Sequence, residues 1–81
     1  MTEVLVHSAC MVLTDKCGYV EPIRHDGEFD VYDLDVGKHY WVGCGKMTYK
    51  ILVYDKGFDI VEISLESIDY YCKEVVVNEP D

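Results

Sequence analysis

The sequence predicts a small all-β fold: an antiparallel meander, an SH3-like barrel or a compact sandwich. Turn-forming residues recur at short intervals, and the segments between them are rich in β-branched and aromatic residues, a pattern typical of such folds. Each turn pairs a glycine with polar neighbours. The expected turns lie at residues 15–18, 25–27, 36–38, 43–45 and 55–57. With 81 residues, the chain has material for one modest core, so we expect a single domain over residues 1–81.

The first predicted strand, residues 3–13, is apolar on both faces, which indicates a central strand or one that bends between two layers. The second spans residues 19–23, where Pro22 favours an edge position because proline cannot donate a ladder hydrogen bond. Further strands are expected at residues 28–36, 38–42, 47–54 and 58–65. In the strand at 47–54, alternation places Ile51 and Val53 on one face with Met47 and Tyr49.

At residues 65–72 the pattern changes from that of a strand to that of a helix. Leu65, Ile68 and Cys72 fall at helical spacing after a serine that can cap a helix. We expect one short helical turn or two there, followed by a closing strand at residues 75–77. The predicted core consists of Val4, Val6, Val12, Phe29, Val31, Trp41, Ile51, Val53, Val61 and Ile63.

The charge excludes two classes of partner. Sixteen acidic residues against seven basic ones give a formal net charge of -9, which opposes direct binding to nucleic acid or to an anionic membrane. No apolar run is long enough for a membrane-spanning helix. The first residues lack the basic segment and cleavage site of a secretory signal, so we expect a cytoplasmic protein.

Cysteine spacing points away from metal and cofactor binding. The four cysteines are Cys10, Cys17, Cys44 and Cys72. None of them forms the Cys-x(2–4)-Cys pair of a structural zinc site. A reducing compartment favours free thiols over two disulfides, whose connectivity the sequence would leave open. We therefore expect four free thiols, no metal and no cofactor.

Catalysis has little support. Cys44 lies between Gly43 and Gly45 and is the best candidate for an exposed thiol, yet no histidine is identified as the base that would activate it. A bulge at the strand end explains both glycines, and the loop lacks the further glycine of a phosphate cradle. We expect a non-enzymatic protein.

The most distinctive segment is residues 26–35, with five carboxylates in ten residues and no lysine or arginine between Arg24 and Lys38. It lacks the Asp-x-Asp-x-Asp-Gly run of a calcium loop. Phe29 and Val31 are out of phase with Leu34 and Val36, so we expect a β-bulge at residues 32–33 that turns all four inward.

Such a bulge would gather Glu28, Asp30, Asp33 and Asp35 on the outer face. Carboxylates two residues apart on one strand face lie about 6.5–7 Å apart, close to the spacing of phosphates. The functional hypothesis is an acidic ridge that imitates a nucleic-acid backbone. The alternative is a solvated strand face that only prevents aggregation.

Tyrosine is enriched at protein interfaces, and the chain has seven tyrosines. Tyr32 and Tyr54 are the better candidates for exposed contacts. The predicted partner-binding residues are Glu28, Asp30, Tyr32, Asp33, Asp35 and Tyr54.

These features predict an acidic protein-binding domain. Its sharpest form is a stoichiometric inhibitor that blocks the basic surface of a nucleic-acid-binding enzyme, in the manner of phage-type anti-defence proteins that mimic nucleic acid. The comparison with those proteins concerns size and charge alone. The alternative is a small adaptor or assembly subunit that joins a complex, or forms a homodimer, through its β-edges.

Overall fold

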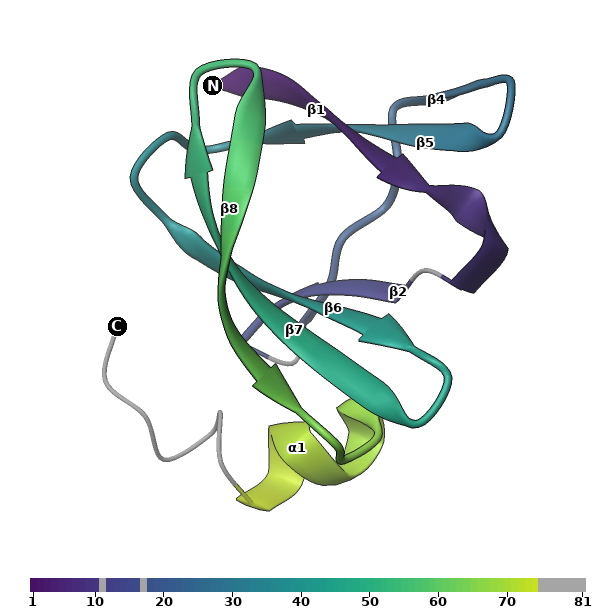
Figure 1. Cartoon of the computed structure of the whole chain (residues 1–81). Helices are drawn as coiled ribbons and strands as arrows, with labels where there is room; N and C mark the ends of the chain where they lie inside the picture. The colour runs from purple at the N-terminus through teal and green to yellow at the C-terminus, as the bar shows by residue number, and fades with distance from the viewer. Residues whose placement is uncertain (11, 17, 75–81) are drawn as a thin grey trace.

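A computed structural model describes residues 1–10, 12–16 and 18–74, the side chain of Cys10 excepted. Strands dominate the chain, and they form two antiparallel sheets accompanied by one short α-helix (Figure 1). The predicted all-β class is confirmed. No helix in the described part of the chain is long and apolar enough to cross a membrane.

The smaller sheet has three strands in the order β1-β5-β4. Its strands are β1 (Thr2–His7), β4 (Arg24–Asp26) and β5 (Phe29–Leu34). The pairing of β1 with β5 runs without a shift from Thr2 opposite Leu34 to His7 opposite Phe29. Strand β5 is therefore regular at residues 32–33, and the prediction of a bulge there is wrong.

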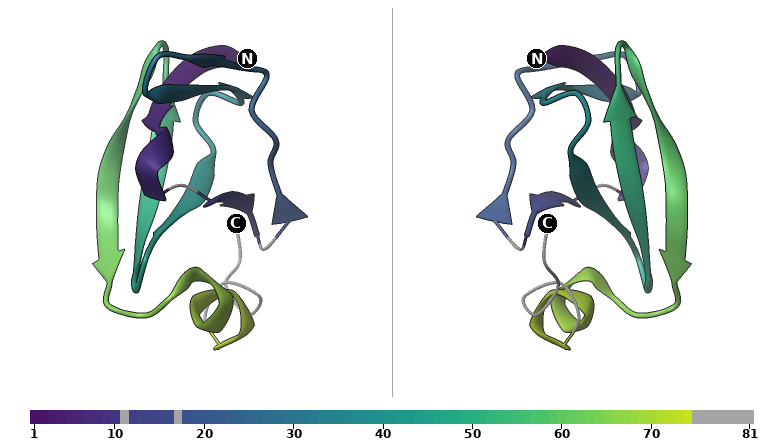
Figure 2. Two further views of the ribbon diagram at one scale, coloured as in Figure 1. Left: turned by 90° about the vertical axis from the view of Figure 1, so that its right-hand side faces the viewer. Right: turned by 90° about the vertical axis from the view of Figure 1, so that its left-hand side faces the viewer.

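The larger sheet has five strands in the order β3-β2-β6-β7-β8. Its strands are β2 (Val12–Asp15), β3 (Gly18–Tyr19), β6 (His39–Cys44), β7 (Met47–Tyr54) and β8 (Gly57–Ser64). The β7–β8 pairing contains a register shift at Lys50 and Ile51, which marks a bulge in this pair. Helix α1 (Ile68–Glu74) lies against the end of this sheet that is distant from the three-stranded sheet (Figure 2).

The segment predicted as one strand at residues 3–13 passes from one layer to the other. This was one of the two interpretations of its apolar faces, the other being a central strand. Strand β1 belongs to one sheet, a 3-10 turn follows at Ser8–Cys10, and β2 belongs to the other sheet. The strand expected at 19–23 shrinks to the two-residue β3, and Pro22 lies outside it. Strand β4 was not expected. The closing strand predicted at 75–77 lies outside the described residues.

Two apolar clusters stabilise the fold. The main core lies between the sheets and contains Val4, Val6, Leu13, Tyr32, Leu34, Tyr40, Val42, Ile51 and Val53. A second cluster lies between the opposite face of the five-stranded sheet and α1, and it contains Trp41, Ile68, Tyr71 and Cys72. Strand β6 supplies both clusters, because its successive side chains Tyr40 and Trp41 point to opposite covered faces.

The core prediction is right for six of its ten residues and wrong for four. Val12, Phe29, Val61 and Ile63 are between about one-third and three-fifths exposed. Val61 and Ile63 lie on β8, which is the last strand of its sheet in the part of the chain that the structure describes. The neighbouring rings of Tyr40 and Trp41 are both buried, because α1 covers the second face of the sheet.

The glycines around Cys44 are not explained by a strand-end bulge. Strand β6 pairs with β7 without a shift as far as Cys44 opposite Met47. Gly45 stands in the following hairpin turn with φ of 62°, in the left-handed region that favours glycine. Gly43 remains within β6, where its position faces α1.

The expectation of four free thiols is contradicted at Cys44, which forms a disulfide. Cys72 carries a buried thiol in the cluster beneath α1. Cys17 and the side chain of Cys10 lie outside the described part of the chain. The sequence argument failed here because it inferred the redox state from the presumed compartment rather than from the proximity of two cysteines in the fold.

Candidate functional site

The regular pleat of β5 divides the predicted ridge between two faces. Asp30, Tyr32 and Leu34 share the face that meets the five-stranded sheet, while Asp33 points to the other face. Asp30 is 9% exposed and Tyr32 only 2%. The prediction that Glu28, Asp30, Asp33 and Asp35 share one outer face is therefore wrong, as is that of an exposed Tyr32.

The outer face around Asp33 also carries a cation. Asp33 lies opposite Glu3, and the Arg24 guanidinium binds both carboxylate oxygens of Glu3, with Nη2 to Oε1 at 2.7 Å and Nη1 to Oε2 at 3.2 Å. The hydrogen bonds and charge of Arg24 hold the pKa of Glu3 below its usual range, and Glu3 raises the pKa of Arg24 in return. This face is thus partly neutralised.

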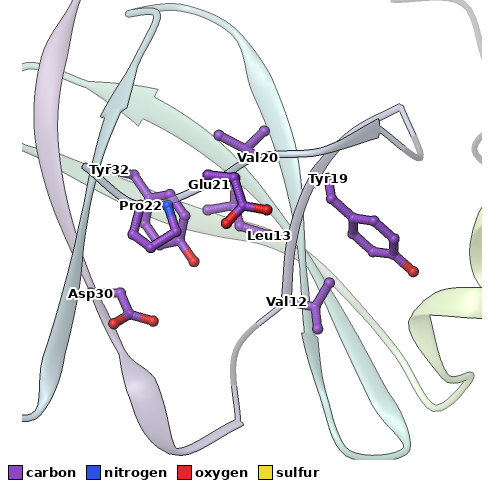
Figure 3. Close-up of a pocket in the computed structure, with 8 residues that line it drawn as sticks. All are labelled: Val12, Leu13, Tyr19, Val20, Glu21, Pro22, Asp30 and Tyr32. Atoms are coloured by element: carbon purple, nitrogen blue, oxygen red, sulfur yellow. The ribbon is translucent and has the colours of Figure 1, made fainter. Parts of the chain in front are cut away.

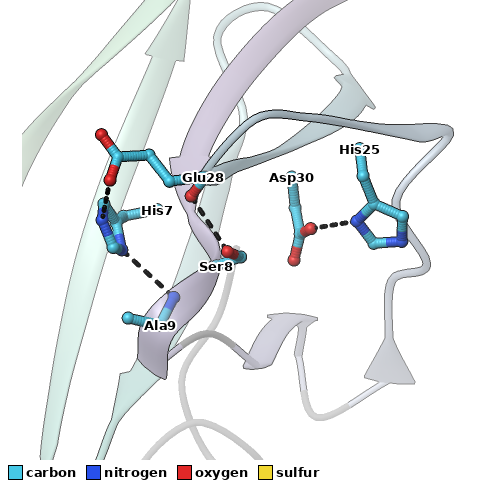
Figure 4. Close-up of polar contacts among 6 residues, drawn as sticks. All are labelled: His7, Ser8, Ala9, His25, Glu28 and Asp30. Carbon is cyan, nitrogen blue, oxygen red and sulfur yellow. Dashed lines mark hydrogen bonds and ion pairs between the residues drawn. The ribbon is translucent and has the colours of Figure 1, made fainter.

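Glu28 is tied to the end of β1 rather than free to meet a partner. Its carboxylate Oε2 lies 3.4 Å from His7 Nε2, while its main-chain oxygen accepts a hydrogen bond from the Ser8 hydroxyl at 2.9 Å (Figure 4). The other ring nitrogen of His7, Nδ1, accepts the N–H of Ala9 at 3.1 Å. A neutral His7 therefore carries its proton on Nε2, where it faces Glu28.

Asp35 and Tyr54 lie at the end of the molecule opposite Glu28. Both side chains are exposed, Asp35 just beyond β5 and Tyr54 at the last position of β7. The segment after β5 is held beside β7 because the N–H of Gly37 donates to the main-chain oxygen of Val53 at 2.8 Å. The structure thus brings these two predicted residues to one end and leaves Glu28 at the other.

Asp30 and Tyr32 instead line a cavity of about 320 Å³ (Figure 3). Its other lining residues come from β2, β3 and the segment that follows β3: Val12, Leu13, Tyr19, Val20, Glu21 and Pro22. Two main-chain hydrogen bonds position that segment. The N–H of Val20 donates to Leu13 in one sheet at 2.9 Å, and the N–H of Ile23 donates to Val31 in the other at 2.7 Å. The segment therefore bridges the two sheets along one side of the cavity.

Asp30 is paired with His25 across the hairpin between β4 and β5. Oxygen Oδ1 of Asp30 contacts Nδ1 of His25 in a short hydrogen bond (Figure 4). The Asp30 side chain is 12% exposed, while that of His25 is 74% exposed. A nearly buried carboxylate thus has a partner that mostly faces solvent.

The Tyr32 hydroxyl has no hydrogen-bond partner among the residues that the structure describes, although its side chain is almost completely buried. Burial raises the pKa of this phenol, and the nearby carboxylates Asp30 and Glu21 raise it further. The group therefore stays neutral at physiological pH and retains both a donor and an acceptor for a ligand in the cavity.

Sequence reasoning missed Glu21, Pro22 and His25. Pro22 was assigned to an edge strand, and its incompatibility with a ladder was the signal that this segment could instead cross between sheets. His25 stands five residues before Asp30, on the other side of the turn at Gly27, a spacing that could have indicated a cross-strand pair.

The described residues contain no group of three histidine, cysteine or acidic side chains placed to hold a metal ion. No family model, curated protein or solved structure matches the chain. Charge, burial and the cavity are consequently the features on which a functional argument depends.

Proposed function

We propose that the chain is a non-enzymatic, acidic protein-binding domain. Its sharpest form is a stoichiometric inhibitor that occupies the basic, nucleic-acid-binding surface of a partner enzyme, as phage-type nucleic-acid mimics with an anti-defence role do. One observation carries the proposal: seven exposed carboxylates form neither a salt bridge nor a side-chain hydrogen bond within the described part of the chain. These are Glu21, Asp26, Asp33, Asp35, Asp59, Glu66 and Glu74.

These carboxylates outweigh the available cations. Two of the seven basic residues are already committed, Arg24 to Glu3 and Lys38 to Asp15, the latter with Nζ to Oδ2 at 2.6 Å. The unpaired acids lie on several elements rather than on one ridge. Uncompensated negative charge of this kind accelerates encounter with a positive surface and opposes encounter with nucleic acid itself.

The experiment begins with capture of partners on the immobilised chain at low salt, followed by binding measurements with the purified partner. We expect the affinity to fall steeply as salt rises and the partner's nucleic acid to compete for the same surface. Binding that is insensitive to salt, or a ternary complex with nucleic acid, would refute the proposal.

Charge reversal supplies the matched variants. Asp33 and Asp35 are exposed and unpaired, so the variant D33K/D35K should keep its thermal stability and bind the partner at least about tenfold more weakly. The control D33N/D35N removes the charge without reversing it and should have an intermediate effect. Reversal at Asp30 is unsuitable, because its side chain is nearly buried against His25.

A cytoplasmic location belongs to this proposal. The disulfide of Cys44 argues against it, because reducing compartments disfavour such bonds. Alkylation of thiols in intact cells, before extraction, tests the point: a Cys44 that is alkylated there supports a reducing compartment, and a protected Cys44 refutes the cytoplasmic location.

Self-association is the second candidate function, and strand β8 favours it. Among the described residues, no strand pairs with the outer side of this eight-residue edge strand, and Ile60, Val61 and Ile63 are each about half exposed. Such an edge is a template for another strand. Antiparallel pairing of two copies centred on Val61 would set Asp59 of one copy opposite Ile63 of the other, so no carboxylates would face each other directly.

The two candidates predict opposite effects of salt. Two copies of a chain with charge -9 repel each other, so self-association should strengthen as salt rises, whereas binding to a basic partner should weaken. Sedimentation at several concentrations measures the first. The variant V61K should remain monomeric at every salt concentration, since a lysine on an edge opposes strand pairing. A wild-type chain that stays monomeric at high salt and high concentration would rule out the second candidate.

A further inference from the structure

We propose that the cavity between β5 and the segment 19–22 binds a cationic side chain of the partner protein, and that arginine is preferred over lysine. The inference rests on the proposed function, because it assumes a basic partner. It adds one specific binding site, the cavity, to the general attraction between the acidic chain and that partner. Three features of the described residues support it: the carboxylates, the free phenol and the apolar walls.

The carboxylates define the charge of the ligand. Asp30 lies almost buried in the cavity wall, and Glu21 stands on the opposing segment. The structure shows His25 on Oδ1 of Asp30 and no further hydrogen bond to this carboxylate from the described residues. A nearly buried carboxylate gains most from a charged donor, and an anionic or purely apolar ligand would leave it less well compensated.

The phenol of Tyr32 supplies a second polar group. Its hydroxyl faces the cavity without a partner among the described residues, and it stays neutral because burial raises its pKa. Its oxygen can therefore accept a hydrogen bond from a guanidinium held by Asp30. A guanidinium that bonds to this hydroxyl gains a contact that an apolar ligand does not.

The walls of the cavity can accommodate the aliphatic part of a long side chain. Val12, Leu13 and Pro22 line the cavity with apolar surface that can cover methylene groups (Figure 3). A volume of about 320 Å³ is at the lower end for small-molecule pockets, which fits one side chain better than a larger ligand.

The arrangement favours arginine over lysine. A guanidinium presents five N–H donors in a plane, so it can bond to both oxygens of one carboxylate, or to two neighbouring acceptors, at the same time. An ammonium is a compact point charge that is more strongly hydrated and gains less from this geometry.

The test is an NMR titration of the isotope-labelled chain with N-acetyl-arginine amide. N-acetyl-citrulline amide, a neutral analogue of the same shape, is the control. We expect saturable shifts of the backbone amides of residues 20, 21 and 30–32 with arginine and none with citrulline. N-acetyl-lysine amide should bind at least about threefold more weakly, because it donates fewer hydrogen bonds.

Matched variants localise the site. The substitution Asp30→Asn should weaken arginine binding at least about tenfold, since it removes the buried charge. Asp33→Asn removes a charge from the same strand on the opposite face and should leave binding within about twofold of wild type. Glu21→Gln alters an exposed residue that the fold does not need and should weaken binding about threefold or more.

Equal binding of citrulline and arginine, equal binding of lysine and arginine, or an unchanged affinity in both D30N and E21Q would overturn the inference. The titration uses the chain alone, so its outcome is separate from that of the proposed function. Salt-dependent partner binding with a negative titration refutes only the cavity as receptor. A positive titration with salt-insensitive partner binding refutes only the inhibitor.

Discussion

A Cβ atom built on Gly43 would stand 2.8 Å from the Cβ atom of Ile68, closer than carbon atoms approach in folded proteins. Gly43 lies in β6, on the face that also presents Trp41 to the helix. A helix of seven residues has little intrinsic stability, so its position depends on packing. The missing side chain at residue 43 lets α1 approach the sheet closely enough to bury Trp41.

The first prediction follows from this contact. Gly43→Ala should displace Ile68 and lower the free energy of unfolding by about 1–3 kcal/mol, as overpacked sites do. Urea unfolding measures the change. Gly18→Ala is the control, because its added methyl would meet only Asp15, at an ordinary distance of 3.4 Å, and no change beyond about 0.5 kcal/mol is expected. Equal losses in the two variants would contradict this account of the helix contact.

The second prediction separates the core from the open edge. Ile51 is completely buried between the sheets, whereas Ile63 on β8 is 57% exposed. Ile51→Ala should therefore lower the free energy of unfolding by about 2–4 kcal/mol, and Ile63→Ala by less than about 1 kcal/mol. The same urea experiment compares them. A larger loss at Ile63 than at Ile51 would mean that β8 is covered in solution.

The third prediction concerns the alkaline range. Because burial and two nearby carboxylates raise the pKa of Tyr32 above its ordinary value of 10.0, this phenol should ionise later in an alkaline titration than an unperturbed tyrosine would. Ultraviolet absorbance follows the ionisation. Tyr32→Phe should remove the late component of this titration, and an unchanged curve in that variant would contradict the raised pKa of Tyr32.

The same shift links folding stability to pH. The folded state disfavours the tyrosinate form, so the contribution of Tyr32 is fully present below the unfolded pKa of about 10. It is lost as pH rises from there through the raised folded pKa. The free energy of unfolding should therefore decline more steeply in this range for the wild type than for Tyr32→Phe. Identical slopes would show that the phenol is not buried.

The fourth prediction is a thiol count. Four cysteines with one disulfide at Cys44 should yield two reactive thiols in protein denatured without reductant, and four after reduction. Reduction should also lower the free energy of unfolding by about 2–4 kcal/mol. Four thiols before reduction would restore the expectation drawn from the sequence. The variant C72S should lose one thiol in both conditions, because Cys72 carries a buried thiol.

Local patterns in the sequence determined most of the strands. Strand β7 has the predicted bounds, residues 47–54, because its alternation is regular and glycine turns bound it on both sides. The position of the helix was also predicted, with a shift from 65–72 to Ile68–Glu74. These features depend on the period of the side chains and on turn chemistry, which neighbouring residues supply.

The predicted ridge failed for a tertiary reason. Bringing Val31 and Leu34 both inside seemed to need a bulge at residues 32–33, because a strand was assumed to have one covered face. In the fold both residues are buried without a bulge, although they lie on opposite faces of the regular strand β5. Pairing with β1 and β4 on either side fixes the strand in that register, and Asp30 and Tyr32 turn inward as a result.

The sequence by itself determined the all-β class, the negative charge and the alternation of the strands, because these depend on composition and on contacts between near neighbours. Only the tertiary structure decided that Glu21 faces the same cavity as Asp30 and Tyr32, that Cys44 forms a disulfide, and that α1 covers Trp41. Each of these depends on which strands become neighbours. That choice comes from long-range packing, and no short window of the chain records it.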